Sequence, residues 1–93
     1  MVLGVLHLEI HIPAAQSLKE KRRVLKSLTD RLRKRFNVAV AELDGMDLWQ
    51  ASVLAVATVA RDSERVNQIL SYAAQFVHAE RSLSVTQESM ELF

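Results

Sequence analysis

The spacing of the apolar residues, which switches between a period of two and a period near 3.6, constrains the fold more than any other feature of this sequence. Residues 2–12 alternate between apolar and polar side chains, which predicts a half-buried strand. Pro13 would end this strand, because proline cannot donate to a sheet ladder. Residues 37–43 predict a short strand, and residues 48–60, almost wholly apolar, predict a long central one.

Two other segments follow the helical period. Between Ser17 and Phe36 the apolar residues gather in one arc, and Ser17 and Glu20 have the spacing of a capping box. A second helix is predicted to begin after Asp62, a favourable N-cap, and to run to about Ala79. Each segment therefore predicts an amphipathic surface helix that packs on a core.

Asp44 and Gly45 are typical of a hairpin turn, since both tolerate positive φ. Residues 83–92 predict a weaker last strand, with a bulge or a fraying end after Gln87, where the alternation blurs. The order strand, helix, strand, strand, helix, strand indicates an α+β fold of the ferredoxin-like βαββαβ kind. Its four-stranded antiparallel sheet would carry both helices on one face. We expect residues 1–93 to form a single domain, because no linker, internal repeat or low-complexity segment interrupts them.

Composition narrows the class of protein further. With 49% hydrophobic residues the chain needs no disulfide or metal to fold, and it has no cysteine for either. No window approaches the roughly 18 apolar residues that span a bilayer. His7, Glu9 and His11 also interrupt the apolar amino terminus, which lacks a basic leader region. We therefore expect a cytoplasmic protein with no membrane segment.

Positive charge is concentrated in the first predicted helix. Of the twelve lysine and arginine residues, nine lie between residues 17 and 36, against two of the eleven acids. Lys21 and Arg35 flank the apolar stripe, where their stems would lie on the core rim while their charges reach water. Six other cations fall within about a third of the helix circumference, and we call this set the basic face: Lys19, Arg22, Arg23, Lys26, Arg33 and Lys34.

Like charges crowded on one helix face repel by about a few tenths of a kcal/mol per pair, so the basic face favours an external polyanion that would compensate it. The alternative is a solubilising surface, balanced by acids elsewhere on the molecule. Sheet aromatics that stack RNA bases are not predicted, since the strands offer only Trp49 near a strand start. Contact with RNA would therefore run through phosphates and follow shape rather than sequence.

The sheet face opposite the helices is predicted to be open. His7, Glu9, His11 and Glu42 suit such a face, but both alternating sets within residues 48–60 contain aliphatic side chains. An apolar strip on an open sheet suggests burial by a second copy or a partner, although isolated exposed valines are common.

His7, Glu9 and His11 recur at alternate positions, so all three would project from one strand face as weak candidates for metal ligands. Solvated histidines are the commoner situation in such a place. The chain has only two glycines and no phosphate-binding loop, and no nucleophile is paired with a base at a readable spacing. We predict neither an enzyme nor a cofactor.

Three segments in this order resemble the bacterial YlxP-like family, whose function is unknown: residues 17–28 (SLKEKRRVLKSL), 35–42 (RFNVAVAE) and 47–50 (DLWQ). The resemblance covers nearly the whole chain and implies a ferredoxin-like fold, the bacterial cytosol and a gene setting shared with translation factors. It supplies no catalytic residues. Asn37 and Trp49 belong to these segments, and we expect Asn37 to end the helix and Trp49 to cover the core.

The leading hypothesis is a non-catalytic RNA- or ribosome-associated module that contacts phosphates through the basic face. The second is a homodimeric protein-interaction module, which docks an acidic partner with its helix and pairs through the open sheet face. The third and weakest is a metal-dependent enzyme built on His7, Glu9, His11 and Glu42.

Overall fold

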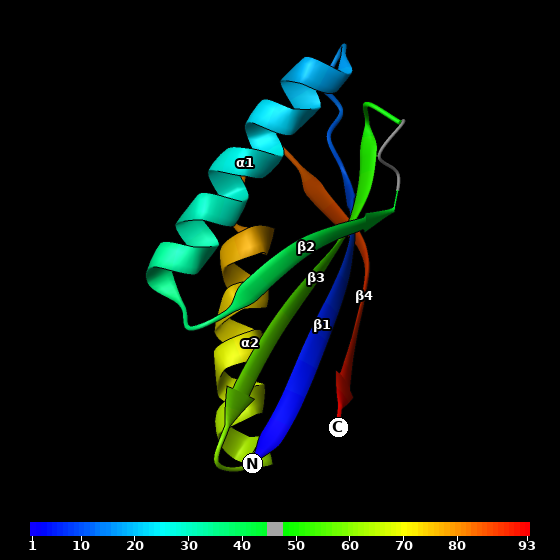
Figure 1. Ribbon diagram of the computed structural model, residues 1–93. Helices are drawn as coiled ribbons and strands as arrows, with labels where there is room; N and C mark the ends of the chain where they lie inside the picture. The colour runs from blue at the N-terminus through cyan, green and yellow to red at the C-terminus, as the bar shows by residue number, and fades with distance from the viewer. Residues whose placement is uncertain (45–47) are drawn as a thin grey trace.

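The computed structural model describes residues 1–44 and 48–93, and the elements follow the predicted order (Figure 1). Their bounds are β1 Val2–His11, α1 Leu18–Arg35, β2 Ala39–Asp44, β3 Ala51–Ala60, α2 Ser63–His78 and β4 Ser84–Leu92. No helix among the described residues has the length and apolar character needed to cross a membrane.

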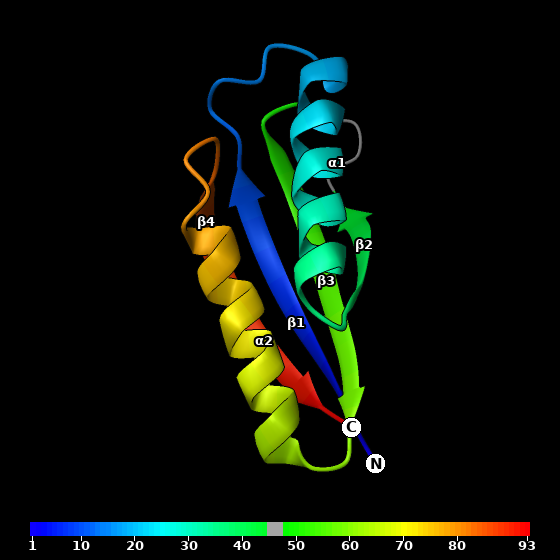
Figure 2. The ribbon, with the colours of Figure 1, turned by 90° about the vertical axis from the view of Figure 1, so that its left-hand side faces the viewer.

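The four strands form one antiparallel sheet in the order β2-β3-β1-β4, so β3 and β1 are central. Both helices lie on the same face of this sheet, with α2 beside β1 and α1 on the side of β2 (Figure 2). The ferredoxin-like βαββαβ arrangement predicted from the apolar spacing is confirmed.

The core lies between the sheet and the two helices, because the even-numbered residues of β1 and β3 point toward the helices. Leu8 is the fully buried partner of Leu54 across these strands, and Leu6 pairs with Val56. The helices meet them with their predicted apolar stripes, which include Leu25, Leu28, Leu32, Val66, Leu70, Ala73 and Val77. This packing turns the opposite side of α1 to solvent.

Both predicted helix starts are confirmed by their caps. Ser17 Oγ accepts a hydrogen bond from the Glu20 amide at 3.2 Å, and the Glu20 carboxylate in turn accepts one from the Gln16 amide at 2.6 Å. In α2 the Asp62 side chain accepts from the Arg65 amide at 2.8 Å. Amide groups that no helical carbonyl can reach are thereby satisfied.

Several boundaries differ from the sequence predictions. The third strand begins at Ala51 rather than at residue 48, and Trp49 before it is 51% exposed and does not cover the core. The irregularity of β4 lies just before Gln87, where Val85 pairs with Ile10 and Gln87 with Glu9, and regular pairing continues to Leu92. The predicted turn at Gly45 lies outside the described residues.

An ion pair connects α1 to the loop after α2. Arg31 Nη2 lies 2.6 Å from Glu80 Oε2, and the hydrogen bond from Arg31 is the main cause of the lowered pKa of Glu80. A carboxyl whose pKa falls on folding stabilises the protein above its unfolded pKa, and this stability is lost as the pH falls through the folded pKa.

We expect Glu80→Gln to lower the free energy of unfolding by about 0.5–1 kcal/mol at neutral pH, the range of a partly exposed pair. The difference from wild type should shrink as the pH falls through the lowered pKa of folded Glu80, because protonation then removes its charge in both states. Urea denaturation at two pH values, one neutral and one acidic, measures both effects. Glu91→Gln, at an exposed position on β4, is the matched control. An equal loss at both pH values would contradict the assignment to charge.

Candidate nucleic-acid interface

All six cations of the basic face are exposed, because α1 buries the opposite side of its circumference. Leu25, Leu28 and Leu32 anchor that buried side in the core. The basic face therefore lies on the outer surface of the two-layer fold, away from the sheet. The structure brings together the residues that the helical projection predicted, on one continuous helix surface.

The described part of the protein neutralises little of this charge. Lys26 Nζ lies 2.9 Å from Asp30 Oδ2 on the next turn, and both side chains are exposed. Arg33 donates a hydrogen bond of 3.0 Å to the Val40 carbonyl, which holds one end of its guanidinium but adds no negative charge. Within residues 1–44 and 48–93, no carboxylate forms an ion pair with the other four members, which are Lys19, Arg22, Arg23 and Lys34.

Asp30 is the single acid within the basic face. Its pKa is lowered, first by the hydrogen bond from Lys26 and then by the charges of Lys26, Arg33 and Lys34, against an opposing desolvation effect. Asp30 is therefore ionised at neutral pH and offsets one positive charge among six. The surface around it keeps an excess of positive charge.

The two remaining arginines of the helix belong to a different contact. Besides the pairing of Arg31 with Glu80, the guanidinium carbons of Arg31 and Arg35 each lie 5.7 Å from the centre of the Phe76 ring on α2. Cations over an aromatic face are held there by the ring quadrupole. Arg31 and Arg35 therefore help to join the helices.

A groove of about 430 Å³ separates α1 from β2, next to the basic face. Arg22, Lys26 and Arg33 line its helix side. Asp30 and Glu42 also line it, so the groove carries charges of both signs. The other three cations of the basic face do not line this groove with its two carboxylates. They are Lys19, Arg23 and Lys34, and all three are exposed.

The expectation that the charge of Lys21 reaches water is wrong, because this side chain is buried. The side chain is only 1% exposed, and its Nζ donates a 2.6 Å hydrogen bond to the Leu48 carbonyl and lies 3.3 Å from Glu42 Oε2. The same Glu42 oxygen accepts a 2.6 Å hydrogen bond from Ser52 Oγ. Lys21 thus joins α1 to β2, β3 and the segment before β3, and it has no part in the basic face.

The prediction that Glu42 lies on the open sheet face is also wrong. It pairs with Leu54 and shares the helix-covered side of β2 with Val40. The reason is parity, because alternate residues of a strand point to the same face. Its carboxylate is therefore the partner of Lys21 and lies away from His7, Glu9 and His11.

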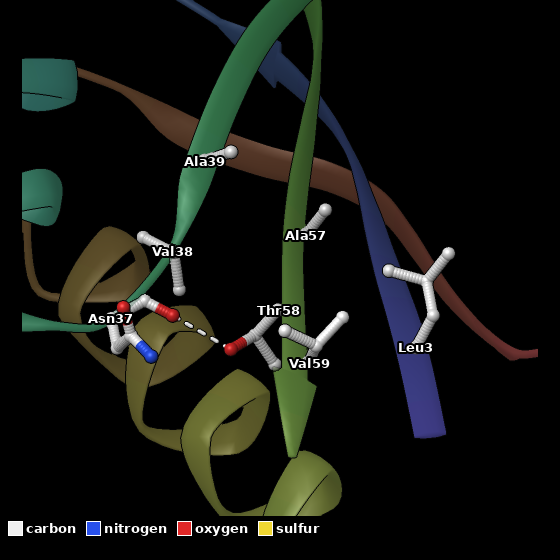
Figure 3. Close-up of a pocket in the computed structure, with 7 residues that line it drawn as sticks. All are labelled: Leu3, Asn37, Val38, Ala39, Ala57, Thr58 and Val59. Atoms are coloured by element: carbon white, nitrogen blue, oxygen red, sulfur yellow. Dashed lines mark hydrogen bonds between the residues drawn. The ribbon is translucent and has the colours of Figure 1, made fainter. Parts of the chain in front are cut away.

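Gln50 and Asn37, which lie in the segments that resemble the YlxP-like family, make structural contacts that the sequence did not predict. The Gln50 side-chain amide donates to the carbonyls of Pro13 and Ala15 at 3.3 and 3.2 Å, which holds the loop between β1 and α1. The Asn37 carbonyl accepts a 2.6 Å hydrogen bond from Thr58 Oγ1 (Figure 3). The helix ends at Arg35 with the extended Phe36 as its C-cap, so Asn37 is the first residue after the cap.

The weak metal candidates lie on the open face of β1, as predicted. His7 faces Ala55 on β3, and Glu9 faces Val53. Across the described ranges, no grouping of three or more histidine, aspartate or glutamate side chains could hold a metal ion.

Comparisons with known proteins match the fold and most of the chain. Residues 3–90 match the family described as "Protein of unknown function (DUF503)". The uncharacterized protein YlxP of Bacillus subtilis (strain 168) is 31% identical over 90 residues, which cover 92% of this chain and 98% of that protein. Among solved structures, a mutant of SnoaB, a cofactor-independent oxygenase from Streptomyces nogalater, has a TM-score of 0.54 at 15% identity. That alignment covers 99% of this chain and 90% of SnoaB, and its identity supports a common fold alone.

Proposed function

Because this chain belongs to the DUF503 family, which has no assigned function, we propose a function from its surface: a non-catalytic cytoplasmic module that binds structured RNA through the basic face of α1. The observation that carries the proposal is the set of six exposed cations with one carboxylate among them. Ribosomal RNA is one such ligand, since it presents dense arrays of phosphates.

Phosphates suit this surface because each neutralised phosphate releases condensed counterions, which favours binding. The cations lie along one side of an 18-residue helix of about 27 Å, since each residue rises about 1.5 Å. A helix of that length can follow the phosphates of a duplex groove. The guanidinium groups of Arg22 and Arg23 can each donate two parallel hydrogen bonds to a phosphate.

Base stacking on the sheet, by contrast, has little support. The open-face residues of β1 and β3 include no phenylalanine, tyrosine or tryptophan. Recognition through phosphates fixes position on the nucleic acid but reads no sequence directly. The proposal therefore favours shape-selective binding of double-stranded regions.

The test exchanges three basic-face residues that have no ion pair in the described part of the chain, in the variant Arg22→Glu/Arg23→Glu/Lys34→Glu. We expect its affinity for a labelled RNA hairpin to fall on the order of 100-fold, and the dependence of log affinity on log salt to become shallower by about three. Fluorescence anisotropy across a salt series measures both quantities. Circular dichroism verifies the fold.

The chain supplies a matched control. Its only lysine or arginine residues outside α1 are Arg61, Arg65 and Arg81, so Arg61→Glu/Arg65→Glu/Arg81→Glu has the same net charge at other places. This control should bind RNA within a few-fold of wild type. Asp30→Asn should bind several-fold more tightly, since it removes the one acid of the basic face.

Three outcomes would overturn the proposal. The first is a folded α1 variant that binds the hairpin as tightly as wild type. The second is an equal loss in both triple variants, which would reduce the effect to net charge. The third is purification of the native protein with a stoichiometric acidic protein and no nucleic acid, which would favour the protein-docking alternative.

A further inference from the structure

The open sheet face is apolar on β2, β3 and β1 over the half that lies near the end of β3, whereas on the edge strand β4 the charged Glu91 lies beside Val5 in that half. Residues paired across the strands share a face, so the register places Ala39 beside Ala57, and Ala57 beside Val5. The next row toward the start of β2 and the end of β3 holds Val59 and Leu3. Polar residues, including Glu9, occupy the other half of β1.

The same end of the sheet carries exposed large side chains. Leu3 is 37% exposed and Val59 is 48% exposed. Phe93 lies beside Leu3, since their backbones exchange two hydrogen bonds of 2.7 and 3.5 Å, and it is 67% exposed. These three exposed apolar side chains are neighbours and form a patch. A patch of this kind indicates an interaction surface, whereas single exposed apolar residues are common on protein surfaces.

A hollow of about 340 Å³ lies next to this patch, on the side of β2. Figure 3 shows that it is lined by Leu3, Asn37, Val38, Ala39, Ala57, Thr58 and Val59. The hollow forms because small alanine side chains occupy adjacent positions on β2 and β3. The open face therefore offers both projecting side chains, on the β1 and β4 side, and a recess that could receive them, on the β2 side.

We propose that this face is covered by a second copy of the chain. The two-fold axis would run roughly along the strands, because that arrangement sets the apolar half of one sheet on the apolar half of the other. It also reverses the strand order, so that β4 of each copy lies over β2 of its partner. Phe93 on the β4 side then reaches the partner's hollow beside Ala39, and the contact repeats by symmetry.

The area reaches that of a specific interface when the whole open face is covered. The four strands hold 35 residues, and at roughly 3.3 Å per residue and about 4.8 Å between strands they cover about 550 Å². Two copies that pair over the whole face, its polar half included, would bury about 1,100 Å², close to the ~1,000 Å² that marks a specific interface. Both helices cover the other face of each sheet (Figure 2). The dimer would therefore carry its two basic faces on opposite outer surfaces and offer two sites for polyanions.

Light scattering and sedimentation of the full chain, from micromolar to sub-millimolar concentration, test the pairing without any RNA. Wild type should be a dimer over most of this range. Ala57→Glu places a charge at the centre of the interface, and it should give a folded monomer. Val59→Lys, at a half-exposed position that the fold tolerates more easily, should weaken the dimer at least about tenfold, since a buried unpaired charge is costly.

Ala79→Glu makes the same chemical change at an exposed helix cap and should dimerise like wild type. Wild type that stays monomeric at sub-millimolar concentration would overturn the proposal, as would Val59→Lys and Ala57→Glu dimers as tight as that of Ala79→Glu. Because no arm of this experiment uses RNA, its result is independent of the function proposed for the basic face.

Discussion

Lys21→Ala is expected to lower the free energy of unfolding by about 3 kcal/mol, because it removes the buried partner of a partly buried ion pair together with a buried stem. The reason lies in the contacts of a side chain that is almost wholly buried. Its ammonium bonds the Leu48 carbonyl and pairs with Glu42, and its stem packs within the core. Alanine removes both contacts and leaves a cavity beside a carboxylate.

Urea denaturation followed by circular dichroism measures this loss. Lys19→Ala is the matched control, because Lys19 lies two residues earlier on the same helix and is exposed. Its effect should stay within about 0.5 kcal/mol of wild type, as for most surface substitutions. Lys21→Met keeps most of the volume and should recover part of the loss, which separates packing from charge. A Lys21→Ala variant as stable as Lys19→Ala would contradict the role assigned to the pair.

The fold could be predicted because each element is specified by local spacing. The alternation in β1 and the apolar arc of α1 each imply one buried face, and Ser17 and Asp62 mark where the helices begin. With the elements in this order, rules of connection leave few sheet topologies. The exposed basic face followed from the same projection, since its members lie opposite the apolar stripe.

Contacts between distant segments were harder to predict. Lys21 falls between Leu28 and Leu32 on the helical projection, so the sequence carried a signal that its side chain points into the core. Glu42 has the same parity as the buried Val40, which was the corresponding signal on β2. Neither pattern alone states that the two residues meet, because the pairing depends on how α1 crosses the sheet. Trp49 was misplaced because β3 begins two residues beyond it.

Gly4→Val is expected to be the other large loss, at about 3 kcal/mol, the upper range for overpacking a dense core. Gly4 lies in β1 beneath α2, and a β-carbon added there would overlap Val66 Cγ1. It would also lie 3.0 Å from Leu70 Cδ1 and 3.2 Å from Leu92 Cδ2. Val66 and Leu70 are fully buried, so these neighbours have little room to move.

A double-mutant cycle with Val66→Ala separates this overlap from any general weakening of the strand. Val66→Ala alone should cost about 2 kcal/mol through its cavity. In the double variant Gly4→Val/Val66→Ala, the new side chain occupies the space that Val66 vacates. The combined loss, measured by urea denaturation, should therefore be smaller than the two single losses together by about 1–3 kcal/mol. Additive losses would show that α2 does not press on β1 at Gly4.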